Sequence, residues 1–235
     1  SVAERLAEGV VATASTDSAF AALKRGGAVV TWGHGQEGGD ACNAPLAQQL
    51  SSSVASVVGN SSAFVAIKEE GGVVAWGDPR HGGDTSRVAD RLLGGVRSVT
   101  GTRRAFAAML SEGEVIAWGH PEAGGDAGAS ASRLSSGCIL SIVATNDAFA
   151  AVTDGGEVVT WGLASAGGDS SIVAEEISGW PTNSPRAVVS VVSTSGAFAA
   201  LQRGGSVVTW GEAESGGESH SVAESLTGGV ISLVG

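Results

Sequence analysis

Tyrosine is absent from this 235-residue chain, and cysteine occurs only twice, at Cys42 and Cys138. Two cysteines are too few for a disulfide scaffold, and they indicate neither a compartment nor their own redox state. Charged residues make up only 16% of the chain, and the 13 Lys and Arg are outnumbered by 24 Asp and Glu. Nucleic-acid binding needs clustered basic side chains to neutralise phosphates, so this composition argues against it.

Long hydrophobic runs are also missing, because no apolar stretch approaches the ~18–20 residues of a membrane span. The sequence opens at Ser1 with neither Met nor an apolar signal segment, which suggests a processed or excised piece. A hydrophobic share of 43% is enough to build a core. We therefore expect an acidic, folded chain that is soluble, or held at a membrane only through a partner.

What the chain has in abundance is glycine, with 37 residues, arranged in an internal repeat. Every Phe follows an Ala, and a Trp comes twelve residues later, followed after six more residues by Gly-Gly and an acid. The Phe residues are spaced by 44, 42, 43 and 49 positions. We interpret the aromatic residues as the core of each repeat: Phe20 and Trp32, Phe64 and Trp76, Phe106 and Trp118, Phe149 and Trp161, and Phe198 and Trp210.

Each repeat contains three short segments typical of strands. In the second repeat they are residues 54–60, 63–67 and 72–77, which are rich in Val and bounded by Gly, Ser or Asn. Glycine between the second and third segments supplies the positive φ of a hairpin turn. The stretch after Gly-Gly-acid has apolar residues four apart, which fits either one helical turn or an outer strand.

A period of ~40–50 residues is that of propeller blades. We predict an all-β, single repeat domain over 1–235, most simply a five-bladed β-propeller. An open arc, or a fragment of a longer repeat array, is the alternative, because the first strand occurs once more than the others. The predicted repeats cover 10–53, 54–95, 96–138, 139–187 and 188–229, with a sixth copy of the first strand at 230–235.

The phrase Asp-Gly-Gly-Glu-Val-Val-Thr-Trp-Gly at 154–162 resembles the repeat of the regulator of chromosome condensation family, and the resemblance extends over all five repeats. It implies a propeller fold. This chain has Ala-Phe where the family usually has Gly and His, and Gly-Gly-Asp where it has Gly-Gln-Leu-Gly. The family's partner surfaces therefore do not carry over. The variant also looks like repeat arrays of unicellular marine algae, which suggests a chloroplast.

No spacing in the chain points to catalysis. His-x-x-x-His, Cys-x-x-Cys, Gly-x-Ser-x-Gly and phosphate-loop patterns do not occur, so we expect no enzyme activity, cofactor or metal site. An acid recurs after each Gly-Gly, either as a turn or cap residue or as part of an acidic docking surface. These acids are Asp40, Asp84, Asp126, Asp169 and Glu218.

One insertion breaks the repeat, at residues 179–185, and it contains the only Trp outside the pattern. Loops carry function on rigid scaffolds, and an aromatic side chain in a Pro-rich loop suits a partner anchor. It could equally fold back on its blade. The predicted partner-binding residues are Trp180, Pro181, Asn183 and Pro185.

The sequence therefore favours a non-enzymatic protein-protein interaction scaffold. We expect an accessory subunit docked on a larger assembly, such as a photosynthetic membrane complex of an alga. Two alternatives stay open, a glycan-binding propeller and a guanine-nucleotide exchange or regulatory module for a small GTPase. Fold alone does not decide among them.

Overall fold

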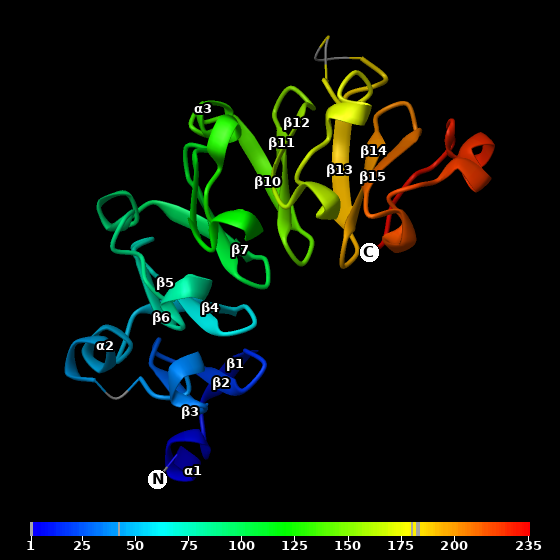
Figure 1. The fold of residues 1–235 in the computed structure, drawn as a ribbon. Coiled ribbons are helices and arrows are strands. Elements are labelled where there is room, and N and C mark those ends of the chain that lie inside the picture. Colours follow the sequence, from blue (N-terminus) through cyan, green and yellow to red (C-terminus); the bar gives the residue numbers. More distant parts are fainter. Residues whose placement is uncertain (1, 42, 180, 182–183) are drawn as a thin grey trace. The chain divides into compact units, whose positions relative to one another are not determined.

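The computed structural model describes residues 2–41, 43–179, 181 and 184–235. In this part of the chain it contains five antiparallel sheets, each of three strands that are consecutive in the sequence (Figure 1). We call each sheet a blade and number the blades in chain order. The chain divides into two compact units, Ser1–Ser111 with Ile116–His120, and Glu112–Val115 with Pro121–Gly235.

The strands are short, at five or six residues each, as the valine-rich segments predict. They are β1 (Val10–Ser15), β2 (Ala19–Lys24) and β3 (Val29–Gly33) in blade 1; β4 (Val54–Gly59), β5 (Ala63–Lys68) and β6 (Val73–Gly77) in blade 2; β7 (Val96–Gly101), β8 (Ala105–Leu110) and β9 (Val115–Gly119) in blade 3; β10 (Ile139–Ala144), β11 (Ala148–Thr153) and β12 (Val158–Gly162) in blade 4; and β13 (Val188–Ser193), β14 (Ala197–Gln202) and β15 (Val207–Gly211) in blade 5.

The links between blades contain helical turns, which settles the alternative that the sequence left open. The links contain α2 (Ala44–Gln49), α3 (Ala131–Leu134) and short 3-10 turns such as η3 (Ala89–Arg91) and η7 (Ser171–Val173), while α1 (Val2–Leu6) precedes blade 1 and η9 (His220–Leu226) follows blade 5. Asn43 caps α2 by accepting the Leu46 N–H at 3.0 Å.

The apolar core lies between consecutive blades as well as within them. One cluster joins Ala19, Ala21 and Leu23 of blade 1 to Phe64 and Trp76 of blade 2, with Leu50 of the link between them. Equivalent clusters join blades 2 and 3 and blades 4 and 5. A single three-stranded sheet cannot bury its own apolar face, so neighbouring blades stabilise one another.

The aromatic pairs stack within each blade, with ring centroids 4.9 to 5.7 Å apart. Four of the five Phe side chains are almost completely buried, with exposed fractions of 0 to 1%. Phe20 was expected in the core as well, but it is 49% exposed. The reason is its place in the first blade, because the other four Phe rings are covered by the loop of the preceding blade.

The sixth copy of the first strand, at residues 230–235, does not form a strand. The N–H of Val230 donates to the Gly205 carbonyl at 3.0 Å, as Val54 does to Gly27 and Val188 to Gly156. Residues 230–235 pair with no strand of the described chain, and Ile231 is 93% exposed.

Candidate partner-binding site

The link between blades 4 and 5 carries the insertion that the sequence singled out. Pro181 and Pro185 are exposed, whereas Trp180, Thr182 and Asn183 lie outside the described residues. The Ser184 N–H donates to the Pro181 carbonyl at 2.7 Å, and the Ala187 N–H donates to the Ser184 carbonyl at 3.0 Å. A tight turn over residues 184–187 therefore leads from the insertion into β13.

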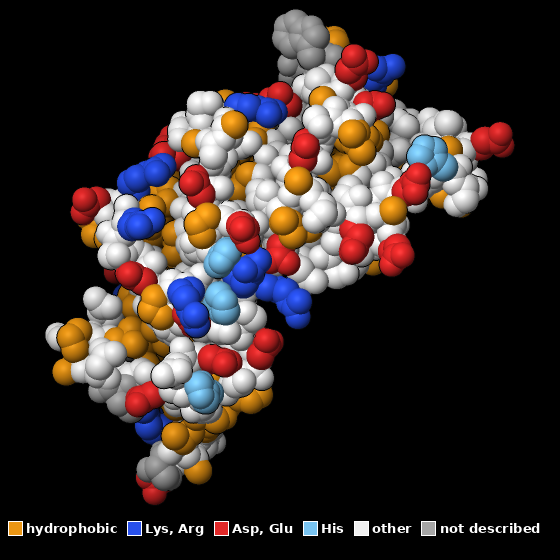
Figure 2. Space-filling model, in the orientation of Figure 1, with side chains coloured by type: hydrophobic (Ala, Val, Ile, Leu, Met, Phe, Trp, Pro, Cys, Tyr) orange, Lys and Arg blue, Asp and Glu red, His pale blue; other side chains and the backbone are white. Residues whose placement is uncertain are grey.

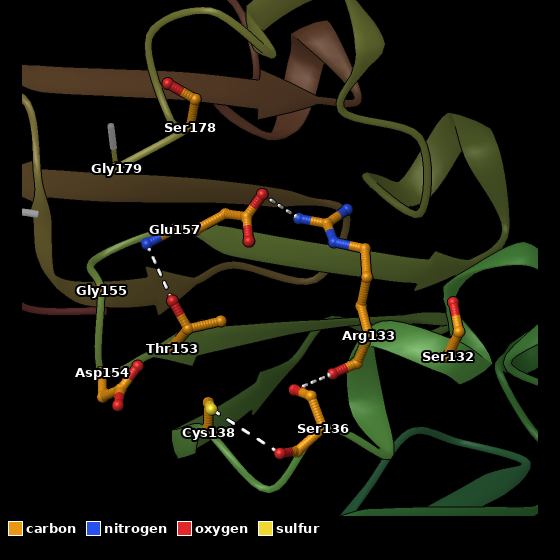
Figure 3. Close-up of a pocket in the computed structure, with 10 residues that line it drawn as sticks. All are labelled: Ser132, Arg133, Ser136, Cys138, Thr153, Asp154, Gly155, Glu157, Ser178 and Gly179. Atoms are coloured by element: carbon orange, nitrogen blue, oxygen red, sulfur yellow. Dashed lines mark hydrogen bonds and ion pairs between the residues drawn. The ribbon is translucent and has the colours of Figure 1, made fainter. Parts of the chain in front are cut away.

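A hollow of about 430 Å³ opens beside the start of this insertion. Its wall comes from α3 and the residues after it, the end of β11, the β11–β12 turn, and Ser178 and Gly179 where the insertion begins (Figure 3). The lining residues are Ser132, Arg133, Ser136, Cys138, Thr153, Asp154, Gly155, Glu157, Ser178 and Gly179. All of them belong to one compact unit, which makes the hollow a local feature of blade 4 and its links.

An ion pair crosses the hollow. Arg133 points from α3 toward Glu157 of the hairpin turn, and their charged atoms lie 2.7 Å apart (Figure 3). The same guanidinium donates to the Val158 carbonyl at 3.1 Å. The two side chains are 45% and 42% exposed, and an ion pair in such surroundings contributes only about 0–1 kcal/mol to stability. A charged partner group can therefore replace either member at little cost.

Hydrogen bonds hold the backbone around this pair. The Glu157 N–H donates to the Thr153 hydroxyl at 3.0 Å, and the Ser136 hydroxyl donates to the Arg133 carbonyl at 2.7 Å. The wall offers hydroxyls, a thiol, carboxylates and a guanidinium, but no imidazole. This set can donate and accept hydrogen bonds with a peptide, and it pairs no nucleophile with a histidine base.

The recurring acids are all exposed, and three of them make the same local contact. Asp84, Asp126 and Asp169 each accept the backbone N–H two residues ahead, at 2.8 to 2.9 Å. The bond from Ser171 lowers the pKa of Asp169 below its ordinary value. Glu218 instead lies 3.0 Å from the ring of His220, and Asp40 is exposed.

Asp84, Asp126 and Asp169 therefore act as turn residues, whereas the acidic docking surface stays a prediction. Figure 2 shows Asp and Glu side chains spread among other surface groups rather than gathered in one patch. In the described part of the chain, no group of three or more His, Cys, Asp or Glu side chains is placed to hold a metal ion.

One repeated polar position escaped the sequence analysis, four residues before each Phe. The side chains of Thr16, Asn60, Thr102, Thr145 and Thr194 accept the N–H at the start of the second strand, at 2.9 to 3.1 Å. Thr16, Asn60, Thr145 and Thr194 also donate to the carbonyl of the residue before Gly-Gly, at 2.7 to 3.3 Å. A side chain with both hydrogen bonds fixes the distance between the start of the second strand and the Gly-Gly loop. The regular occurrence of Thr or Asn at this position could have revealed this role.

The repeated Trp residues are buried after the first blade. Trp76, Trp118, Trp161 and Trp210 are 0 to 4% exposed, and each ring N–H donates to the first Gly carbonyl of the preceding Gly-Gly at 2.9 to 3.1 Å. A sugar-binding blade would need an exposed aromatic at a repeated position. The structure therefore disfavours the glycan-binding alternative.

Comparison with known proteins supports the fold. No family model matches the chain, and no curated protein matches its sequence. The structure of Prp20p from Saccharomyces cerevisiae, described with its binding to Gsp1p and histones, is similar over 88% of this chain, with 18% identity and a TM-score of 0.52. The chain is an all-β repeat protein with propeller blades.

Other solved structures are similar at lower scores. The ectodomain of the Physcomitrella patens receptor kinase CR4 matches 86% of this chain, with 20% identity and a TM-score of 0.49. Human WBSCR16 matches 82% of it, with 19% identity and a TM-score of 0.46. This chain covers 59% of the Prp20p chain, 50% of the CR4 chain and 57% of the WBSCR16 chain.

Proposed function

We propose that this chain is a non-enzymatic protein-interaction module of the regulator of chromosome condensation type, an accessory subunit docked on a larger assembly. The observation that carries this proposal is the hollow beside the insertion at residues 179–185. Its exposed ion pair, Arg133 with Glu157, is weak and can exchange for contacts with a partner. The hollow lies where the repeat is interrupted, on a frame that the blade cores hold rigid. No described helix has the length and apolar character needed to cross a bilayer.

The partner surface that fits this hollow is a peptide loop with a charged side chain. Arg133 and Glu157 present opposite charges 2.7 Å apart in the lining of the hollow, and Pro181 and Pro185 of the insertion are exposed. A partner carboxylate can pair with Arg133, and a partner cation can pair with Glu157, while Trp180 supplies the apolar anchor. Exposed ion pairs are weak, and buried aromatic side chains dominate binding energy, so the anchor provides affinity and the charges provide selectivity.

The native mass of the endogenous protein tests this function. After gentle solubilisation and size separation, we expect the chain to migrate with a large assembly, identified by mass spectrometry of the co-migrating proteins. The likeness of the repeats to arrays of unicellular marine algae suggests a photosynthetic membrane complex as this assembly. A chain that migrates near its own 23.1 kDa contradicts the accessory-subunit role.

Variants then test whether the assembly binds this chain at the hollow. Trp180→Ala should reduce co-migration at least about tenfold, the loss expected for a hot-spot residue, and Arg133→Ala should reduce it by a smaller factor. Arg80→Ala is the matched control, because the exposed Arg80 side chain also makes an ion pair, 2.9 Å from Asp78, and does not line the hollow. Equal losses in all three variants would place the partner surface elsewhere.

A further inference from the structure

Basic side chains come together where blades 2 and 3 meet, at one end of their strands. The β4–β5 turn, residues 60–62, is hydrogen-bonded to both sides of this junction. The side-chain amide of Asn60 donates to the His81 carbonyl at 2.7 Å, and the Ser61 N–H donates to the Arg103 carbonyl at 3.3 Å. The turn therefore joins the loop after blade 2 to the β7–β8 turn of blade 3, within one compact unit.

The β7–β8 turn brings in two more basic residues. Arg104 follows Arg103, and its carbonyl accepts the His120 N–H at 2.8 Å. Figure 2 shows His side chains next to Lys or Arg side chains near the middle of the view. We call the four residues that these hydrogen bonds bring together the basic junction: His81, Arg103, Arg104 and His120.

Both imidazole rings of the basic junction have one edge turned inward. Nδ1 of His81 and Nδ1 of His120 are buried and have no hydrogen-bond partner among the described residues. Nδ1 of His81 lies 3.9 Å from the Asp78 carboxylate, whose charge is already paired with Arg80 at 2.9 Å. The His81 side chain is still 23% exposed, and His120 is half-buried. The ring edges that a ligand can reach are therefore those that carry Nε2.

The contact between blades does not itself require these cations. The corresponding positions at the other three junctions hold no Lys, Arg or His. They are Glu37, Ser61, Ser62 and Asp78 between blades 1 and 2; Ala123, Asn146, Asp147 and Leu163 between blades 3 and 4; and Ala166, Ser195, Gly196 and Glu212 between blades 4 and 5. Because the fold accepts small and acidic residues there, the four basic groups at one junction serve a purpose other than packing.

We propose that the basic junction binds a phosphate group. Arg103 is exposed, and the N–H groups of its planar guanidinium match phosphate oxygens in pairs. The Nε2–H groups of His81 and His120 add one donor each. The net charge of −11 repels a long polyanion such as nucleic acid, so the ligand is a single phosphate, free or carried by a partner side chain.

This site is separate from the hollow beside the insertion at residues 179–185. The residues that line the hollow belong to the second compact unit, whereas the basic junction belongs entirely to the first. Phosphate binding therefore stands or falls independently of the proposed partner-binding role.

NMR titration of the full chain with inorganic phosphate tests the proposal, at fixed pH and at constant ionic strength set with chloride. The four histidines supply the readout. The imidazole resonances of His81 and His120 should shift and saturate, with a dissociation constant of about 1 mM or below. The resonances of His34 and His220, which lie outside the basic junction, should stay in place.

A pair of arginine variants then tests the guanidinium contact. Arg103→Gln should weaken phosphate binding at least about tenfold, the usual effect of losing a hydrogen bond to a charged group. Arg25→Gln is the matched control and should bind as wild type does. Arg25 is also exposed and lies in the same compact unit, but its β2–β3 turn is at the opposite end of the strands from the β1–β2 turn.

A peptide that carries one phosphoserine separates the two sources of phosphate. Tighter binding of this peptide than of inorganic phosphate identifies a phosphorylated partner, and equal or weaker binding identifies free phosphate; both results support the site. Shifts that do not saturate, or that are equal at all four histidines, overturn the proposal. It is also overturned if Arg103→Gln binds phosphate as tightly as Arg25→Gln.

Discussion

Blades 1 and 2 contain the same phrase, Ala-Phe followed twelve residues later by Trp-Gly, and both stack Phe on Trp. Yet Phe20 is 49% exposed and Phe64 is fully buried. The difference comes from the residue opposite the other face of the ring, because Gly38 of the blade 1 loop lies against Phe64, whereas Phe20 belongs to the first blade described. The repeat phrase therefore forms a blade by itself, but only a neighbour completes its core.

The largest effect expected from this comparison is at the Phe rings. Phe64→Ala should lower the free energy of unfolding by about 3–5 kcal/mol, the usual cost of emptying a buried Phe site. Phe20→Ala should cost about half of that or less, because half of its surface is already in water. Urea unfolding at low protein concentration measures both. Equal losses would mean that Phe20 is covered in solution.

Two glycine substitutions test the same difference between covered and open contacts, with a smaller expected loss of stability. Gly82→Ala and Gly216→Ala both force a side chain into a left-handed backbone, at φ of +94° and +99°, which costs about 1–2 kcal/mol. Only at Gly82 does the new Cβ meet a ring, 2.6 Å from Phe106, which adds about 1–3 kcal/mol of overpacking. Thermal unfolding of the two variants should differ by that added cost. A Gly216→Ala variant as unstable as Gly82→Ala would contradict the open loop.

The smallest effect concerns the acids after Gly-Gly. The backbone N–H of Ser171 lowers the pKa of Asp169 below 3.8, so this group adds stability that is present above pH 3.8 and is lost as the pH falls through the lowered value. Asp169→Asn should remove that part of the acid dependence and leave unfolding at pH 7 changed by a few tenths of a kcal/mol. Unfolding curves between pH 2.5 and about 6 compare the variant with wild type. An identical pH profile in the variant would show that the turn bond does not depend on charge.

Much of the fold follows from local pattern. The Val-rich segments, the turn glycines and the twelve-residue step from Phe to Trp depend on neighbours in sequence, and all five sheets formed where they were expected. Residues 230–235 carry the same strand phrase but form no strand in the structure. Helical links could not be distinguished from strands, since apolar residues four apart fit both.

The candidate site was only partly accessible to such reasoning. The insertion was visible as a break in the repeat, but the hollow beside it draws on α3, β11, the β11–β12 turn and the link, which are far apart in sequence. No local rule pairs Arg133 with Glu157, 24 residues away. The Thr or Asn before each Phe was a regular signal that could have been read.

The sequence by itself determined the number of repeats, the three strands of each blade and the aromatic pair within it, because these depend on side-chain alternation and turn chemistry over a few residues. Only the tertiary structure decided which glycine each Phe ring covers, which leucines are buried and where the hollow opens. Those outcomes depend on surfaces that meet across ~40 residues, and the same phrase has a different environment wherever its neighbour is missing.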